Sequence, residues 1–431
     1  MGLFGTLAAL LTVTALFAYA NHRTVRLPTT IGVMLIALLT SLALLALHGV
    51  GIDLDVPARR LLQGIDFDET LLQGMLSFLL FAGALHVDLG DLAEHKGTIA
   101  VLATFGVVIS TAVIGGLTFL AAGALGLDLR LIDALLFGAL ISPTDPIAVM
   151  GLLSTMGVPR SLETKIAGES LFNDGVGVVV FLILLELARG TEPVTAGDVA
   201  LLFAQEAGGG ALFGAVAGYV AYRMLRSIDD YKVEVLVTLA LVTGGYALAG
   251  ALHLSAPIAI VVAGLLIGNQ GRAFAMSDLT RDRLDVFWEL IDEVLNAVLF
   301  VLIGLEILVI TFAPSAVVLA LLAVPIALLG RSVGVFVPLA GLRPFGLRQE
   351  AGVKRVLVWG GLRGGISVAL ALSLPPGPVR ETLLVATYAV VVFSIVVQGL
   401  TVPRLVRHVL QTGPPRDLDP LDEDSGPPAV A

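Results

Sequence analysis

The sequence predicts an all-α protein that crosses a membrane many times, and three observations support this fold class. Hydrophobic residues make up 57% of the 431 residues and charged residues only 14%. Apolar runs repeatedly reach the roughly 20 residues that a helix needs to span a bilayer. These runs are continuously apolar, as in Gly97 to Leu127, which carries no charge. A transmembrane β-strand would alternate instead, so a β-barrel is excluded.

Hydropathy, combined with breaks at glycine, proline and charged residues, predicts about thirteen transmembrane helices. They are expected near residues 3–20, 28–49, 70–87, 97–122, 131–155, 163–188, 197–225, 233–252, 255–271, 285–311, 315–340, 353–374 and 381–409. The first run has no basic segment before it, so it is expected to be a retained span rather than a signal peptide. Residues 1–410 should therefore form one transmembrane domain.

The distribution of lysine and arginine predicts the orientation of the chain. Of the 25 basic residues, 18 lie in segments on the side of the C-terminus and five on the other side. The positive-inside rule then places the N-terminus outside and the C-terminus in the cytoplasm, as expected for a multi-pass protein of the cell (inner) membrane. Residues 411–431 combine prolines with acidic residues and are predicted to form a disordered acidic cytoplasmic tail.

Composition also excludes several classes of site. The chain has no cysteine, which rules out disulfides and thiolate metal sites. None of the six histidines falls among the central acidic residues, so a zinc site is unsupported. The basic residues are spread over many short loops and form no patch that would bind nucleic acid.

Two of the predicted helices are interrupted near the middle of the membrane. Ser142–Pro146 contains two prolines, and proline removes a backbone donor and breaks a helix. Trp359–Gly365 contains four glycines around Arg363, and each glycine costs ~1 kcal/mol in a helix. Interrupted helices in both halves of a transporter indicate a midplane site built from inverted repeats.

The alternative is that the prolines kink an ordinary packed helix and the glycines merely allow close contact. A charge at each break weighs against this alternative, because half-helix ends carry partial charges. Asp145 could neutralise helix N-termini at the breaks and Arg363 could neutralise C-termini.

Three carboxylates, Asp145, Glu169 and Asp174, lie within otherwise apolar spans. An ionisable side chain at membrane depth costs at least ~2.5–3.5 kcal/mol and usually marks an ion or proton path. On a helix, Glu169 and Asn173 share one face, and Ser170 and Asp174 share the adjoining face. This helix therefore presents two neighbouring polar stripes.

A hard cation needs several oxygen ligands. Asp174, Ser170 and the pair Thr144 and Asp145 could supply them, with water completing the shell. Because burial disfavours the ionised form of a carboxylic acid, protons and cations can compete for Asp174. Asn173 could contact the ion or form a hydrogen bond between helices.

Glu169 is expected to form a structural ion pair that holds two helices together. Its partner could be either Arg331 or Arg363, which both lie within spans.

A further polar stripe recurs at helical spacing. It consists of Asp285, Glu289, Asp292, Glu293 and Asn296. It could line a cytoplasmic funnel that concentrates cations, or it could be a solvated helix end. Glu306, further along, is assigned no role.

Four motifs, in this order and spacing, resemble the monovalent cation/proton antiporter superfamily, specifically sodium/proton exchangers of the NhaP type. They are Ile141–Val149, Gly168–Gly175, Leu302–Glu306 and Gly360–Gly365. The resemblance implies an NhaA-like antiporter fold with thirteen helices, a homodimer and no cofactor. It also implies a core domain with crossed broken helices, here roughly 97–188 and 315–409, and a dimerisation part, roughly 1–87 and 197–311.

The resemblance also implies roles for the site residues. Asp174 would carry the cation and the proton, Thr144 and Ser170 would contribute ligands, and Asp145 would shape the crossing. Asn173 matches the asparagine of the electroneutral branch, since the electrogenic branch has a second aspartate there.

The resemblance further implies that the structural glutamate, Glu169, pairs with Arg331. We therefore expect a secondary active antiporter, not an enzyme, that exchanges Na⁺ or Li⁺ for H⁺ one for one by alternating access. Exchange of K⁺ for H⁺ by the same apparatus is the nearer alternative.

Two further classes are disfavoured. An intramembrane aspartyl protease needs a dyad that shares a proton at short range, and the sequence has no Gly-x-Gly-Asp element. A passive cation channel needs an open pore rather than a single alternating site.

Overall fold

The fold was analysed in a computed structural model that describes residues 3–63, 74–145, 149–150, 153, 156, 158–190, 196–310, 313–342, 344 and 351–412. All regular secondary structure in these residues is helical. The one β-type pairing among them is an isolated bridge between Asp145 and Leu362. The predicted all-α class is confirmed.

In the described part of the chain, the helices follow one another without an intervening sheet. Those that shape the molecule are α1 (Leu3–Ala20), α2 (Thr29–Gly49), α3 (Val56–Gln63), α4 (Leu76–Leu85), α5 (Leu89–Val101), α6 (Val107–Ala124), α7 (Leu131–Ile141), α9 (Arg160–Arg189), α10 (Ala196–Phe203), α11 (Gly209–Leu225), α12 (Tyr231–Ala251), α13 (Ala256–Leu266), α14 (Arg272–Phe274), α15 (Asp278–Glu306), α16 (Pro314–Gly341), α17 (Ala351–Trp359), α18 (Gly365–Leu372), α19 (Pro378–Phe393) and α20 (Gly399–Thr412).

Eight helices in the described residues are long and apolar enough to cross a membrane. They are Phe4–Val25, Thr29–Gly49, Leu89–Ala124, Arg160–Arg189, Tyr231–Ala251, Ala256–Phe274, Pro314–Gly341 and Pro378–Gln411. Shorter apolar helices, such as α4 and α7, add to them. The polytopic membrane architecture is thus confirmed, and the count of thirteen stays a prediction.

Polar residues set the starts of several helices. Asp88, Ser255 and Ser277 each accept a hydrogen bond from a backbone N–H two or three residues further on, at the starts of α5, α13 and α15. Such N-caps satisfy backbone donors that a helix start leaves without a partner. Helices α5 and α15 therefore begin earlier than the predicted spans 97–122 and 285–311, because hydropathy registers only their apolar part.

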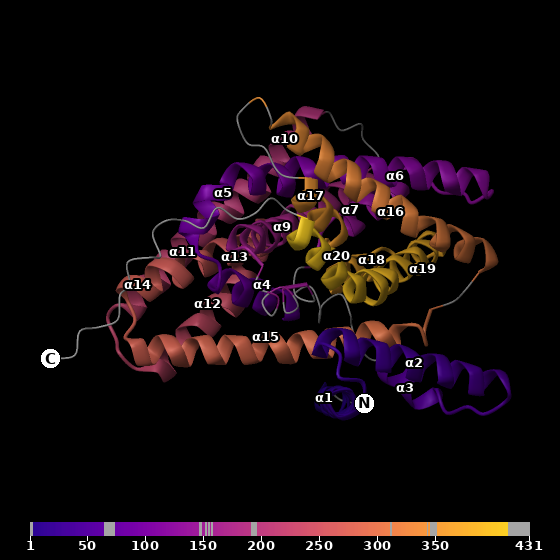
Figure 1. The fold of residues 1–431 in the computed structure, drawn as a ribbon, viewed down its shortest axis with the longest axis horizontal. Coiled ribbons are helices and arrows are strands. Elements are labelled where there is room, and N and C mark those ends of the chain that lie inside the picture. Colours follow the sequence, from indigo (N-terminus) through magenta and orange to yellow (C-terminus); the bar gives the residue numbers. More distant parts are fainter. Residues whose placement is uncertain are drawn as a thin grey trace.

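The helices pack in two groups, which Figure 1 shows. In one group α6 packs on α7 and α16, and α16 packs on α19. In the other, α13 packs on α11 and α4, while the long helix α15 packs on α2 and α4. Helix α9 touches both groups, through α7 and through α13.

Close packing in the first group depends on glycine, which has no side chain. A β-carbon at Gly138 of α7 would lie 2.3 Å from the carbonyl oxygen of Thr111 on α6. Only glycine fits there, as expected for membrane helices whose backbones approach closely.

The last described helix reaches the start of the predicted tail. Helix α20 continues to Thr412, two residues into the segment 411–431. The sequence that follows is Gly413-Pro414-Pro415, which cannot continue a helix. The remainder of the predicted tail, and residues 70–73 at the start of the predicted span 70–87, lie outside the described residues.

Candidate functional site

Both predicted helix interruptions are present, and they cross. Helix α7 ends at Ile141, and residues 142–145 continue without helical structure. Helix α17 ends at Trp359, and α18 begins only at Gly365. Where the two segments meet, the backbone N–H of Asp145 donates to the carbonyl oxygen of Leu362 at 2.8 Å. The part of the predicted span 131–155 that follows this crossing is described only in fragments.

The crossing requires glycine. A β-carbon at Gly364 would lie 2.1 Å from Oδ2 of Asp145 and 2.7 Å from its Cβ. On the other side, a β-carbon at Gly177 of α9 would lie 2.2 Å from Cγ of Pro143. The glycines thus bring α9 and the second interruption directly against the first.

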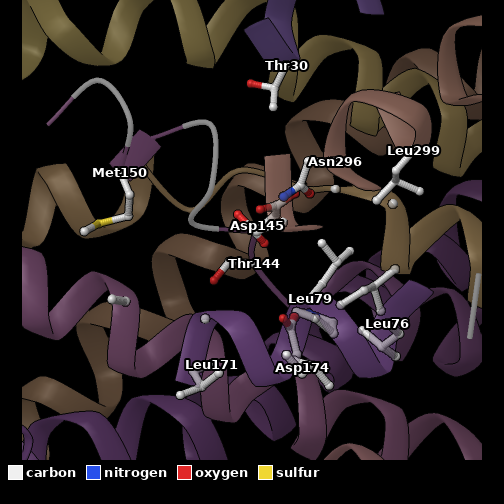
Figure 2. A pocket seen from close by; sticks show the side chains of 18 of the residues that line it. Thr30, Leu76, Leu79, Thr144, Asp145, Met150, Leu171, Asp174, Asn296 and Leu299 are labelled. Carbon is white, nitrogen blue, oxygen red and sulfur yellow. The ribbon is translucent and has the colours of Figure 1, made fainter. Parts of the chain in front are cut away.

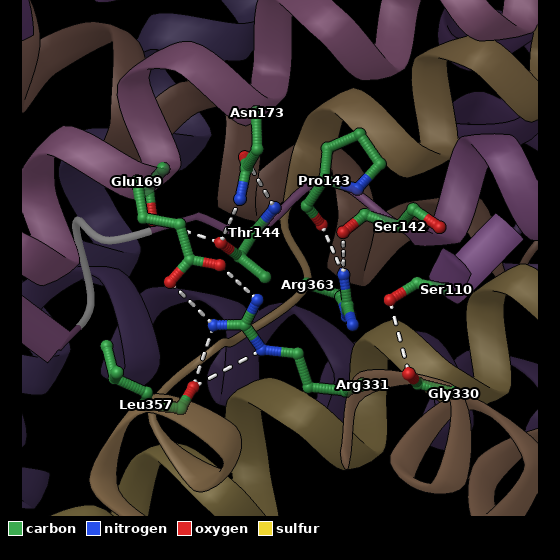
Figure 3. A network of polar contacts seen from close by, with 11 residues as sticks. Ser110, Ser142, Pro143, Thr144, Glu169, Asn173, Gly330, Arg331, Leu357 and Arg363 are labelled. Carbon is green, nitrogen blue, oxygen red and sulfur yellow. Dashed lines mark hydrogen bonds and ion pairs between the residues drawn. The ribbon is translucent and has the colours of Figure 1, made fainter. Parts of the chain in front are cut away.

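A hydrogen-bonded cluster joins the first interruption to α9 (Figure 3). The backbone N–H of Thr144 donates to Oδ1 of Asn173 at 3.1 Å, and Nδ2 of Asn173 donates to Oγ1 of Thr144 at 2.8 Å. The hydroxyls of Thr144 and Ser170 lie 3.0 Å apart. All three side chains are buried. Asn173 therefore forms the helix-to-helix hydrogen bond that the sequence left open.

Asp174 lies on the same helix and faces a cavity of about 590 Å³ (Figure 2). Thr144 and Asp145 line this cavity as well. The side chain of Asp174 is buried. Two carboxylates and a hydroxyl group thus line the same cavity.

Arg363 compensates the end of α7. Its Nη1 donates to the carbonyl oxygens of Ser142 and, at 2.7 Å, of Pro143. Carbonyls at the end of a helix have no partner within the helix and carry partial negative charge. A buried guanidinium suits that position.

Glu169 pairs with Arg331 of α16. Nη1 and Nη2 of Arg331 donate to the two carboxylate oxygens, the second at 2.9 Å. Nη2 also donates to the carbonyl oxygen of Leu357 on α17 at 2.8 Å. Both charged side chains are buried. The sequence had left Arg331 and Arg363 open as partners of Glu169, and the observed partner is Arg331.

Two residues that the sequence analysis did not single out support the second interruption. Oγ of Ser394 accepts from the backbone N–H of Arg363 at 2.8 Å, and Nε2 of Gln398 donates to the carbonyl oxygen of Trp359 at 3.0 Å. They satisfy backbone groups that the break removes from the helix. Their spacing of four residues on an apolar helix was the available signal.

The polar stripe of α15 divides between two positions. Glu289, Asp292, Glu293 and Asn296 line the cavity. Asp285 instead forms an ion pair with Arg272.

The comparisons with known proteins agree with this geometry. The chain matches the family described as "Sodium/hydrogen exchanger, transmembrane" over residues 12–408. It is 53% identical to the Na(+)/H(+) antiporter NhaP of Pseudomonas aeruginosa over 406 residues, which cover 93% of this chain and 96% of that protein. It is 36% identical to the Na(+)/H(+) antiporter NhaH of Halobacillus aidingensis, over 80% of this chain and 84% of that protein.

A solved structure has the same fold. The sodium proton antiporter MjNhaP1 from Methanocaldococcus jannaschii superimposes with a TM-score of 0.74 at 20% identity, covering 95% of this chain and 100% of that one. The resemblance inferred from the four motifs is confirmed. The chain belongs to the sodium/hydrogen exchanger family and is of the NhaP type.

Proposed function

We propose that this protein is a secondary active antiporter that exchanges Na⁺ or Li⁺ for H⁺ across the cell membrane. The observation that carries the proposal is Asp174, a buried carboxylate that faces a cavity beside the crossing of two interrupted helices. An ionised carboxylate attracts a cation, and a protonated one does not. Proton and cation therefore occupy the site in turn, and this alternation is the exchange reaction.

The cation ligands come from two elements. Asp174 supplies the charge and Thr144 supplies a neutral hydroxyl oxygen, and both residues line the cavity. Ser170, whose hydroxyl lies 3.0 Å from that of Thr144 but which does not line the cavity, would add a second hydroxyl oxygen. Hard cations prefer such oxygen ligands. Asn173 forms two hydrogen bonds with Thr144 and so fixes the position of the first interruption along α9. Asp145 adds negative charge at the crossing.

Other charged residues have positioning roles. Arg363 neutralises the carbonyl end of α7 and keeps it next to the second interruption. The Glu169–Arg331 pair ties α9 to α16, and through the Leu357 carbonyl to α17.

Alternating access follows from the position of the cavity. Its walls include α9 and α18, which we assign to the core (97–188 and 315–409), and α4 and α15, which we assign to the dimerisation part (1–87 and 197–311). Motion of the core against the dimerisation part of a homodimer would close this cavity and open its counterpart. With the N-terminus outside, the cavity at the stripe of α15 faces the cytoplasm.

The stoichiometry is inferred from the resemblance to the family. Its electrogenic branch has a second aspartate at the position of Asn173, and Asn173 is neutral. One proton then replaces one monovalent cation, so the exchange is electroneutral.

The test is transport by the purified protein in proteoliposomes. Addition of Na⁺ or Li⁺ to one side should move H⁺ to that side, as read with a pH-sensitive dye. K⁺ is tested in parallel, because exchange of K⁺ by the same site is the nearer alternative. Absence of a response to all three cations would refute the proposal, and cleavage of a membrane peptide would instead support the protease.

A further inference from the structure

Asn296 of α15 is a buried amide, 1% exposed. Among the described residues, neither Oδ1 nor Nδ2 lies within hydrogen-bond distance and angle of a partner, and the polar group beside it is the carboxylate of Asp292 on the same helix. Buried polar groups are nearly always hydrogen-bonded, and an exception requires an explanation. Here the explanation is spatial, since Asn296 lines the cavity that Asp145 and Asp174 also line (Figure 2). The unsatisfied amide therefore indicates that a ligand binds in that cavity.

Acidic residues lead along α15 to Asn296. Glu289 and Glu293 are exposed, Asp292 is partly buried, and Asn296 is buried. At intervals of three and four residues these side chains lie along one side of the helix. All four line the cavity. The series thus runs from solvent into the cavity and ends on a neutral oxygen.

Asp292 and Asn296, at the buried end of this series, line the same cavity as Asp145 at the crossing of the interrupted helices. Asp174, the proposed carrier of α9, lines this cavity as well. Oxygen-bearing side chains of α15 and of the first interruption therefore share one cavity with the proposed carrier.

We propose that Asn296, Asp292 and Asp145 form a second cation site, a staging site that the transported cation occupies on the cytoplasmic side of Asp174. Carboxylate and amide oxygens are the ligands that hard cations accept. The ion at this site is a partly hydrated monovalent cation, the class that the proposed antiport reaction carries. This inference rests on the proposed function.

The position of Asn296 gives the site a direction. Asn296 lies on α15, whereas Asp174 lies on α9 of the part that moves. The amide can therefore reach the cation only while the cavity is open to the cytoplasm. The staging site should affect the affinity for Na⁺ measured from the cytoplasmic side and leave the affinity measured from the outer side unchanged.

The experiment compares both sides of the membrane. Everted vesicles expose the cytoplasmic face of the full-length protein, and right-side-out vesicles expose the outer face. Na⁺-dependent proton movement gives an apparent KM for each face. For Asn296→Leu we expect the cytoplasmic KM to rise on the order of tenfold, the effect of losing one polar contact, at unchanged outer KM. Thr40→Val on α2, whose hydroxyl bonds only its own helix, is the matched control.

A second variant keeps the test independent of folding. Asn296→Asp retains an oxygen and adds a charge, so its cytoplasmic KM should fall below that of the wild type. An unchanged cytoplasmic KM in Asn296→Asp, or an equal rise on both faces in Asn296→Leu, would overturn the staging site. Failure of the wild-type protein to exchange Na⁺ for H⁺ would overturn the proposed function instead.

Discussion

Glu169 and Arg331 form a charged pair in a place where neither has access to bulk water. Two hydrogen bonds join the guanidinium to the carboxylate, and two more join it to the Leu357 carbonyl oxygen. The net stability of such a pair is small, but the removal of one partner leaves an uncompensated buried charge. At the scale of single residues, this pair is therefore sensitive to the loss of either partner.

Glu169→Ala should lower the free energy of unfolding by ~3–5 kcal/mol, because Arg331 stays buried without its partner. Thermal unfolding of the detergent-solubilised protein measures the effect. Asp278→Asn is the matched control, because Asp278 is 98% exposed in its contact with Arg281, and such surface pairs contribute ~1 kcal/mol or less. Equal stability of Glu169→Ala and the wild type would show that the pair is not formed.

At the scale of elements, the two interruptions fit together because Gly364 of the second interruption has no side chain where it contacts Asp145 of the first. A β-carbon at Gly364 would lie 2.7 Å from the Cβ of Asp145. Rotation of the Asp145 carboxylate would not relieve this contact, because the Cβ does not move with it. Any side chain there must move the first interruption and, with it, Thr144.

Gly364→Ala should therefore reduce the rate of exchange on the order of tenfold or more, because small displacements of a reacting group have large effects. Gly116→Ala in α6 is the control, since a β-carbon there would meet nothing within 4 Å. This control should be as active as the wild type and slightly more stable, because alanine favours a helix over glycine. Full activity of Gly364→Ala would contradict the observed crossing.

The connection from α2 to α3 contains a pH-dependent contact outside the membrane spans. The hydrogen bond from Arg59 holds the pKa of Asp55 below its usual value of 3.8, and His48 contributes at 3.1 Å. A lowered pKa means that the ionised pair stabilises the folded state above about pH 4, and that this stability is lost as the pH falls further.

Asp55→Asn removes that contribution, so the difference in Tm from the wild type should be largest at about pH 6 and shrink towards about pH 3. Thermal unfolding across this range measures it. Asp53→Asn, whose side chain also contacts His48 but is 65% exposed, is the control. A difference in Tm that stays constant from pH 6 to pH 3 would show that Asp55 does not act through its charge.

At the scale of the whole molecule, the proposed antiport moves no net charge. With Asn173 neutral, one monovalent cation replaces one proton. A membrane potential imposed on proteoliposomes with valinomycin and K⁺, after a control for K⁺ transport, should therefore leave the rate of Na⁺/H⁺ exchange unchanged. A rate that rises with one sign of the potential and falls with the other would refute the one-for-one stoichiometry.

Much of this organisation follows from the sequence, because its chemistry is local. Prolines and glycines at mid-span mark the two breaks, and the spacing of Glu169, Ser170, Asn173 and Asp174 places them on adjoining faces of one helix. Spacing alone could not identify the partner of Glu169, since Arg331 and Arg363 both lie in spans. The resemblance to the family implied Arg331, and the structure shows this pair.

The starts of α5 and α15 were also missed, for a different reason. Hydropathy detects the part of a helix that suits a membrane, whereas capped polar turns extend these helices beyond it. The supporting contacts of Ser394 and Gln398 required the three-dimensional arrangement, because they bond backbone atoms more than 30 residues away in the chain.

The central claim is that H⁺ and Na⁺ compete for the carboxylate of Asp174. Titration calorimetry of Na⁺ into the purified protein, in buffers of different ionisation enthalpy, counts the protons released on binding. The wild type should release about one proton per Na⁺ at a pH where Asp174 is protonated, and Asp174→Asn should release none. Release of a proton by Asp174→Asn, or Na⁺ binding to the wild type without proton release at any pH, would contradict the account.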